Sequence, residues 1–249
     1  MKRFIVSRYS LLTFILGISI VGVLIGMSLK SIADHNQAAR MIREAGGVLS
    51  IQNDDLHVEL TRGTPEQVLE ALLVNQPSGL RVWNCKLGVR DARIVGSLTN
   101  LKSLDLKNIT FAPSAVRELQ GLSTLTRLQL VNCSLSDSEI SLSWFPQLEH
   151  LDLSDNLIGN HTFTSVEGAT ELQSLVLTNT RITDEGIVAL SQFTRLGTLV
   201  ISGCDFSRQA LAALLEAGSV QMVTLYSTNL TDADIGLLKK QAPNVTFYY

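Results

Sequence analysis

Residues 172–193, LQSLVLTNTRITDEGIVALSQF, contain the stretch that decides the fold. Apolar residues in it follow the pattern L-x-x-L-x-L-x-x-(N/C/T)-x-I, which predicts a short strand and a turn, and Thr183 then opens a helix-like run. One short strand and one short helix offer each other too little surface to bury their apolar sides. We therefore expect this unit to be stable only beside copies of itself.

Copies of the unit are present at a nearly constant spacing. The first residue of the unit, which we call the leading position, recurs at Pro77, Leu101, Leu125, Leu148, Leu172, Leu196 and Val220. The intervals between these residues are 24, 24, 23, 24, 24 and 24. The L-x-L pair that follows recurs with the same spacing, from Leu80 and Val82 in the first unit to Val223 and Leu225 in the last. Seven units, the first and last imperfect, thus predict one solenoid.

The repeat resembles that of bacterial leucine-rich repeat proteins with T-D-x-G-L turns. Residues 172–187, LQSLVLTNTRITDEGI, and residues 220–235, VQMVTLYSTNLTDADI, match LxxLxLxxTxITDxGL. Residues 45–48, AGGV, followed by aspartates 54 and 55, resemble the start of planctomycete-type members, and related repeats occur in ribonuclease-inhibitor-like and cysteine-containing repeat proteins. The resemblance implies an α/β solenoid with a curved parallel sheet on its concave face and helices on its convex face. It implies protein interaction and supplies no catalytic residue.

Some units depart from the T-D-x-G turn. They are residues 111–116 (FAPSAV), 159–164 (GNHTFT) and 206–211 (FSRQAL), where the sequence leaves the loop shape open. A hydroxyl residue also stands where each helix-like run begins and predicts an N-cap, because its side chain can accept a hydrogen bond from a first-turn N–H. These residues are Ser136, Thr183, Ser207 and Thr231.

A membrane segment is predicted ahead of the repeats. Residues 11–29 contain no charge, and a helix of this length covers ~28 Å, close to the hydrocarbon core of about 30 Å. A cleaved signal peptide is the alternative, with residues 31–33, SIA, as its cleavage site. We favour an uncleaved anchor, since the apolar run exceeds the roughly 7–15 residues of a signal peptide. The basic residues 1–10 then form a cytoplasmic tail, and the repeats lie outside the cytoplasm.

Two shorter segments connect this anchor to the repeats. Residues 30–47 are polar with a weak apolar stripe and predict a stalk or cap helix that stops at Gly46-Gly47. Residues 48–76 contain two strand-like runs and a helical run, and we interpret them as the N-terminal cap of the solenoid. The leucine-rich repeats then occupy residues 77–249, and residues 244–249 predict one further, incomplete strand.

Composition and cysteine spacing exclude several roles. A net charge of -3 and a pI near 5.8 give no basic footprint for nucleic acid. Cys85, Cys133 and Cys204 occupy the same repeat position. Strands ~4.8 Å apart would separate them by roughly 10 and 15 Å, whereas a disulfide needs Cα atoms within about 7 Å. We therefore expect buried, unreactive thiols.

One constellation has the residue types of a hydrolase triad. His150, Asp152 and Ser154 alternate along a predicted strand and point to one face. Side chains two residues apart begin nearly 7 Å from each other at ~3.3 Å per residue, but a nucleophile and its base approach to ~3 Å. A row of polar residues is the better interpretation. Because no enzyme, cofactor or metal motif is present either, we predict a protein that is not an enzyme and binds no cofactor.

Alternate strand positions should line the concave face. The middle row runs Arg81, Asp105, Gln129, Asp152, Val176, Val200 and Thr224. The next row runs Trp83, Lys107, Val131, Ser154, Thr178, Ser202 and Tyr226. Polar residues gather in the N-terminal half of these rows, whereas the C-terminal half is small and neutral.

This distribution predicts a ligand-binding site on the N-terminal half of the concave face. A tryptophan beside an arginine is a combination that interface hot spots favour. The candidate site residues are Arg81, Trp83, Asp105, Lys107, Arg127, Gln129, His150 and Asp152. A merely solvated sheet face, with Trp83 packed against the cap, is the alternative.

The predicted function is that of a single-pass membrane protein whose concave face binds a protein or cell-envelope ligand. The alternative is a structural or scaffold protein of a membrane assembly, in which the concave face is passive.

Overall fold

The computed structural model describes residues 36–37, 40, 48–52, 55–60, 72–74, 76–164 and 168–249. The predicted anchor at residues 11–29 and most of the predicted stalk at residues 30–47 lie outside the described residues. Within the described ranges, no helix combines the length and the apolar character that crossing a membrane requires.

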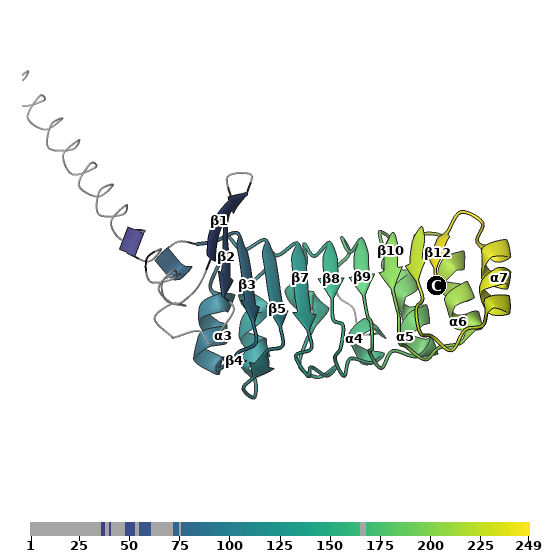
Figure 1. Ribbon diagram of the computed structural model, residues 1–249, viewed down its shortest axis with the longest axis horizontal. Helices are drawn as coiled ribbons and strands as arrows, with labels where there is room; N and C mark the ends of the chain where they lie inside the picture. Colours follow the sequence, from purple (N-terminus) through teal and green to yellow (C-terminus); the bar gives the residue numbers. More distant parts are fainter. Residues whose placement is uncertain are drawn as a thin grey trace, which may run out of the picture.

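The described chain is a curved solenoid with a ten-stranded sheet on one side (Figure 1). The strands of this sheet are, in spatial order, β1 (Val48–Gln52), β2 (Asp55–Leu60), β3 (Gly79–Trp83), β5 (Ser103–Lys107), β7 (Arg127–Val131), β8 (His150–Asp152), β9 (Ser174–Val176), β10 (Thr198–Val200), β11 (Met222–Thr224) and β12 (Thr246–Tyr248). A second sheet pairs β4 (Lys86–Leu87) with β6 (Thr110–Phe111). β12 confirms the strand predicted at the C-terminal end.

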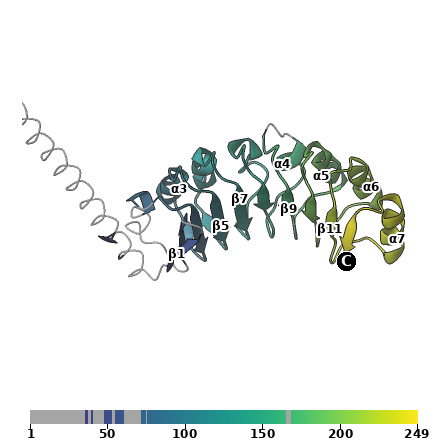
Figure 2. The same ribbon diagram turned by 90° about the horizontal axis from the view of Figure 1, so that it is seen from above.

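Helices cover the opposite face. They are α3 (Val89–Gly96), the 3-10 helices η1 (Ala115–Gly121), η2 (Leu142–Trp144) and η3 (Leu190–Gln192), and the α-helices α4 (His161–Thr164), α5 (Asp184–Ala189), α6 (Arg208–Glu216) and α7 (Asp232–Gln241). A helix with its side chains is about 10 Å wide, whereas neighbouring strands are ~4.8 Å apart. The helical side is therefore the longer one, and Figure 2 shows the strands on the inside of the arc.

The sheet register confirms the predicted repeat. Leu80 pairs with Leu104, Leu104 with Leu128, and Leu128 with Leu151 across the one shorter interval. All pairings from β2 to β12 are parallel, whereas β1 forms an antiparallel hairpin with β2. β2 aligns Val58 with Leu80, so the segment predicted as a cap adds two strands to the sheet.

A left-handed turn follows the strands of the main sheet. Positive φ angles occur at Asn84, Asn108, Asn132, Asp155, Asn179, Gly203 and Ser227. Asparagine tolerates this conformation better than most residues. The turn lets each backbone N–H reach the next repeat, as in the 2.9 Å bond from Asn84 N to Lys107 O. The Asn108 side chain also donates to Asn84 Oδ1 at 2.7 Å, so the turns are linked to one another.

Inter-repeat contacts replace some of the predicted local caps. Ser207 and Thr231 cap α6 and α7 as predicted. Thr183 occupies the N-cap position of α5 as predicted, but its side chain accepts no hydrogen bond from the first turn of the helix. Its backbone N–H donates to Asn160 Oδ1 of the preceding repeat, and its Oγ1 accepts from Asn160 Nδ2. No helix starts after Ser136, where the chain forms a turn. Its neighbour Asp137 instead accepts hydrogen bonds from the next repeat, including Gly159 N at 2.8 Å.

The cysteines confirm the prediction of buried thiols, since none of the three is in a disulfide. Burial raises the pKa of Cys133 to about 11, so the thiol stays protonated and unreactive at neutral pH.

Asn156, at the same repeat position, is 3% exposed. Its Oδ1 accepts from Cys133 N and Leu135 N, both at 3.0 Å. Its Nδ2 donates to the carbonyl oxygens of Leu130, Leu153 and Ser154.

Replacing this side chain tests how much the buried amide contributes. We expect Asn156→Leu to lower the free energy of unfolding by about 3 kcal/mol or more, because it leaves several buried backbone groups without partners. Thr180→Val at the equivalent position is the matched control. It removes the bond from Thr180 Oγ1 to Leu177 O and a weak 3.5 Å contact with Cys204 Sγ, at a cost of about 1 kcal/mol. Urea unfolding followed by circular dichroism measures both, and an equal loss for the two variants contradicts the prediction.

Candidate functional site

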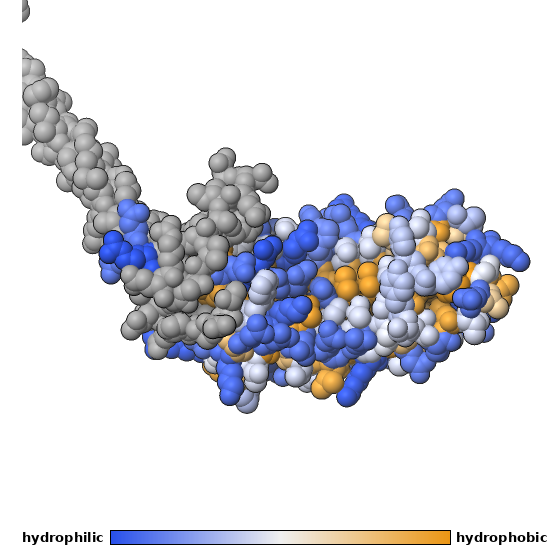
Figure 3. Space-filling view, in the orientation of Figure 1, coloured by the Kyte–Doolittle hydropathy of each residue, from blue (hydrophilic) through white to orange (hydrophobic). Residues whose placement is uncertain are grey.

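The sheet register places the candidate site residues on four neighbouring strands. Arg81 pairs with Asp105, Asp105 with Gln129, and Gln129 with Asp152 along the middle row. The structure therefore brings together the residues of this row, as predicted. Figure 3 shows the concave face, with hydrophilic side chains gathered over β3 to β7 and hydrophobic ones nearer the middle of the sheet. Within the described ranges, this is where charged side chains of both signs meet on adjacent strands.

Arg81 lies between two carboxylates. Its Nη1 is 4.0 Å from Glu59 Oε2 and its Nε is 3.9 Å from Asp105 Oδ2. The Arg81 side chain is 56% exposed, and ion pairs of this length at an exposed site contribute about 0–1 kcal/mol. The guanidinium is thus held loosely and stays accessible to a ligand. Glu59 was not among the predicted residues, because it belongs to the cap, and only the pairing of β2 with β3 brings it here.

Asp105 and Trp83 form a partly buried pair within the site. The pKa of Asp105 is raised, because burial disfavours the charged carboxylate more than the Trp83 N–H and the charges of Arg81 and Lys107 favour it. The nearby Asp152 carboxylate raises this pKa further. The Trp83 indole nitrogen is shielded from solvent and forms no hydrogen bond of good geometry among the described residues. The Trp83 N–H nevertheless lies close enough to Asp105 to lower the pKa of its carboxyl.

Arg127 and His150 are direct neighbours across β7 and β8. The pKa of His150 is lowered by burial and by the Arg127 charge, whereas the Glu149 carboxylate acts in the opposite direction. His150 is therefore neutral at physiological pH and can accept or donate a hydrogen bond. Lys107 is exposed at the end of β5 and pairs in register with Trp83.

In the row of His150, Asp152 and Ser154, hydrogen bonds join Asp152 to Ser154. Asp152 Oδ1 accepts hydrogen bonds from Ser154 N at 2.9 Å and from Ser154 Oγ at 2.6 Å. Ser154 is only 7% exposed, so it is covered rather than open to solvent as predicted, although its bond to Asp152 keeps its side chain on the same face. β8 ends at Asp152, and the chain turns at Ser154 and Asp155. No hydrogen bond links His150 to either residue in the described part of the chain, which is the polar row expected rather than a nucleophile with its base.

The C-terminal half of the concave face carries larger side chains than the small, neutral ones predicted. Val176, Val200 and Thr224 continue the middle row as expected. Met222 is nevertheless 38% exposed and Tyr226 53% exposed, so larger side chains stand at this end. Tyr248 of β12 extends the middle row beyond Thr224 and is also exposed. The signal for Tyr248 was available in the sequence, since it lies 24 residues after Thr224.

Comparison with known proteins finds solved structures of similar fold. A scan against protein-family models and a search of curated proteins both find no match. A leucine-rich repeat protein of Leptospira interrogans superposes with a TM-score of 0.51 at 17% identity, over 75% of this chain and 46% of its own. The protein has a leucine-rich repeat fold. An internalin of Listeria monocytogenes superposes with a TM-score of 0.49 at 20% identity, over 70% of this chain and 48% of its own. The chain thus covers about half of either solved structure.

The Arg127–His150 pair of this chain can be tested by its dependence on pH. The pKa of His150 is lower in the folded state than in the unfolded state. As the pH falls, the histidine of the unfolded state is therefore protonated first. Stability is therefore lost as the pH falls through about 6.5, the ordinary histidine pKa. We expect Arg127→Gln to raise the His150 pKa and Glu149→Gln to lower it. NMR titration of the imidazole, assigned with His150→Gln, measures both shifts, and shifts of the same sign contradict the geometry.

Proposed function

We propose that this leucine-rich repeat protein is a membrane-anchored binding module whose concave face recognises a protein ligand of the cell envelope or its surroundings. The observation that carries the proposal is the alignment of Arg81, Trp83, Asp105, Arg127 and His150 on four adjacent strands. They combine charges of both signs with a tryptophan, on the open side of the arc. Aromatic and arginine side chains contribute most to protein interfaces, and loosely held charges promote recognition and fast association.

The rest of the proposal rests on the sequence. The uncharged residues 11–29 support a single-pass anchor with a cytoplasmic N-terminus and an extracytoplasmic solenoid. The Thr-Asp-x-Gly turns support the bacterial type of repeat, including the planctomycete-type and ribonuclease-inhibitor-like subtype. A mechanism based on surface complementarity needs no catalytic group, and it agrees with a site built from hydrogen-bonding and ionic side chains.

The concave face can be tested by removing its two most interface-like side chains. With a photo-crosslinking residue at Gln129 in the full chain in native membranes, we expect Trp83→Ala with Arg127→Ala to reduce capture of the crosslinked partner roughly 100-fold or more. Quantitative mass spectrometry of the crosslinked product measures the loss. Arg117→Ala is the matched control, since it removes an exposed arginine from η1 on the convex side.

Two results decide between binding and a passive scaffold. Loss of capture in the double variant, with unchanged urea unfolding, supports the concave site. If capture persists in the double variant and Arg117→Ala disturbs the assembly instead, the convex side is the functional surface and the concave proposal is wrong.

The proposed topology has a separate test. Protease added to intact cells with a permeabilised outer layer is expected to digest the chain after Ser31, because the repeats then lie on the outer side of the anchoring membrane. Immunoblotting with an antibody to the repeats measures the product, and lysed cells show that the protease can cut the domain. Full protection in intact cells places the repeats in the cytoplasm.

A further inference from the structure

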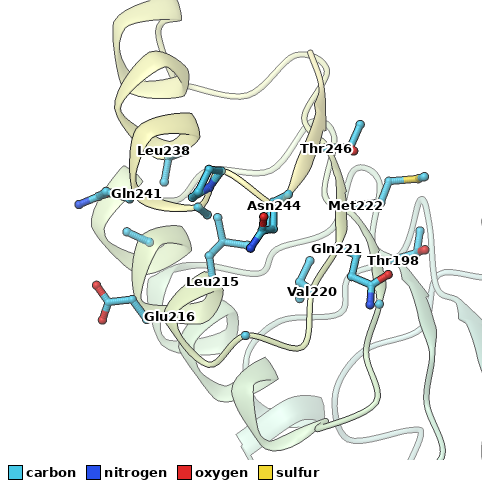
Figure 4. Close-up of a pocket in the computed structure, with 16 residues that line it drawn as sticks. Thr198, Leu215, Glu216, Val220, Gln221, Met222, Leu238, Gln241, Asn244 and Thr246 are labelled. Atoms are coloured by element: carbon cyan, nitrogen blue, oxygen red, sulfur yellow. The ribbon is translucent and has the colours of Figure 1, made fainter.

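Two adjoining hollows lie at the C-terminal end of the solenoid, where helices α6 and α7 lead back into strands. Figure 4 shows the deeper of the two. The deeper one has a volume of about 760 Å³ and the shallower one about 570 Å³. Both are lined by Gly197, Thr198, Gly218 and Gln221, so they lie side by side, and we call the two together the groove. The shallower hollow extends as far as His150, the nearest residue of the concave site.

The deeper hollow exists because two core rows end in polar residues. The leading row is buried from Leu101 to Val220, but its next position, two residues before β12, is the exposed Asn244. A second row on the helical side holds Leu98, Leu122, Phe145, Ala169 and Phe193, all 0–1% exposed. That row continues with Ala217 and Gln241, which are exposed. The large apolar side chains that fill this space in earlier repeats are therefore missing here.

The shallower hollow has a comparable origin on the edge of the sheet. The position just before each strand is occupied by Lys102, Thr126, Glu149, Gln173, Gly197 and Gln221. Only Gly197 in this row has no side chain, and it leaves a notch between two glutamines. A Cβ added there would meet nothing closer than Gln173 O at 3.9 Å, so backbone strain and crowding do not explain the glycine. The notch leaves room for another chain to approach the backbone.

The lining of the groove combines an apolar floor with neutral polar groups. Figure 4 shows Asn244 between Leu215 and Leu238 of the helices on one side and Gln221, just before β11, and Thr246 of β12 on the other. The one ionisable side chain that lines the deeper hollow is a carboxylate, Glu216. The deeper hollow therefore offers no cation to a phosphate or carboxylate ligand.

Polar partners are available along the shallower part. The Ser219 hydroxyl, which lines it, is shielded from solvent and has no hydrogen-bond partner in the described ranges. Gln173 and Gln221 each present an amide, which both donates and accepts hydrogen bonds as a peptide group does. Arg195, the cation of this part, is paired with Glu171. The groove thus suits an elongated, uncharged ligand with one bulky apolar group.

We propose that this groove binds an extended peptide segment of a protein partner. A bulky apolar side chain of the segment fills the deeper hollow, and the peptide backbone crosses Gly197 between Gln173 and Gln221 toward His150. The hollow has the size of a small-ligand pocket, about 300–1,000 Å³, which is ample for one side chain and its neighbours. This goes beyond the proposed concave site: it names a second contact of different chemistry, and its residues other than His150 are separate from that site.

Two variants fill the groove with side chains that other repeats already carry. Gly197→Gln closes the notch, and Asn244→Leu restores the leucine of the leading row. Gly236→Gln is the matched control, because nothing lies within 4 Å of its Cβ position in α7 and it lines neither hollow. Thermal unfolding of the full-length chains shows whether each variant folds, and we expect unchanged or raised melting temperatures.

The probe is a library of short random-sequence peptides, selected against the full-length chain in lipid nanodiscs and resynthesised with a fluorescent label. We expect selected peptides to share a Leu, Met or Phe, and both groove variants to weaken their dissociation constants about tenfold or more. Gly236→Gln should not change them. Trp83→Ala with Arg127→Ala should also leave this binding in place, so failure of the concave site and failure of the groove give different results.

Other outcomes overturn the proposal. Selected peptides that bind Gly197→Gln and Asn244→Leu as tightly as the unchanged chain show that the groove is not their site. A selection that yields no binding peptide has the same meaning. A fluorescent neutral monoacylglycerol that binds the unchanged chain and neither variant assigns the groove to a lipid instead.

Discussion

The parallel backbone ladder between repeats of equal length is the interaction on which the rest of the structure depends. From β3 to β12, each strand donates and accepts hydrogen bonds across the sheet only if its neighbour is displaced by 24 residues, or by 23 at the β7–β8 step. The asparagine turns at Asn84, Asn108 and Asn132 continue the ladder past the strand ends. Once this register is set, equivalent residues form rows that run along the whole solenoid.

Each row then has one physical task. The rows that face inward are leucine, isoleucine, phenylalanine or cysteine, and they form one continuous apolar core. Where the inward row carries Asn156, a full set of hydrogen bonds compensates its burial. The rows that face the concave side carry no packing requirement, and they are the ones that differ between the two halves. Residues in these free rows therefore contain the information about binding partners.

Departures from a row are as informative as the residues that face the open side. Gly197 interrupts a row of longer side chains, and Asn244 interrupts a row of leucines, so both leave space at the surface. These two departures lie two repeats apart, and both line the deeper hollow. The proposed concave site and the proposed groove share His150, which lines the shallower hollow.

The sequence by itself determined the repeat, the parallel sheet, the buried cysteine row and the positions of Arg81, Asp105 and Arg127, because a strict period forces equivalent residues onto one face. Only the tertiary structure decided that Ser154 is covered rather than exposed, that Glu59 joins the site, and that Asn160 and Asp137 cap the following repeat. These three outcomes depend on contacts between segments more than 20 residues apart, or on where a strand ends, and no local pattern encodes either. The same reason applies to the groove, since its volume depends on how α6, α7 and the strand starts pack together.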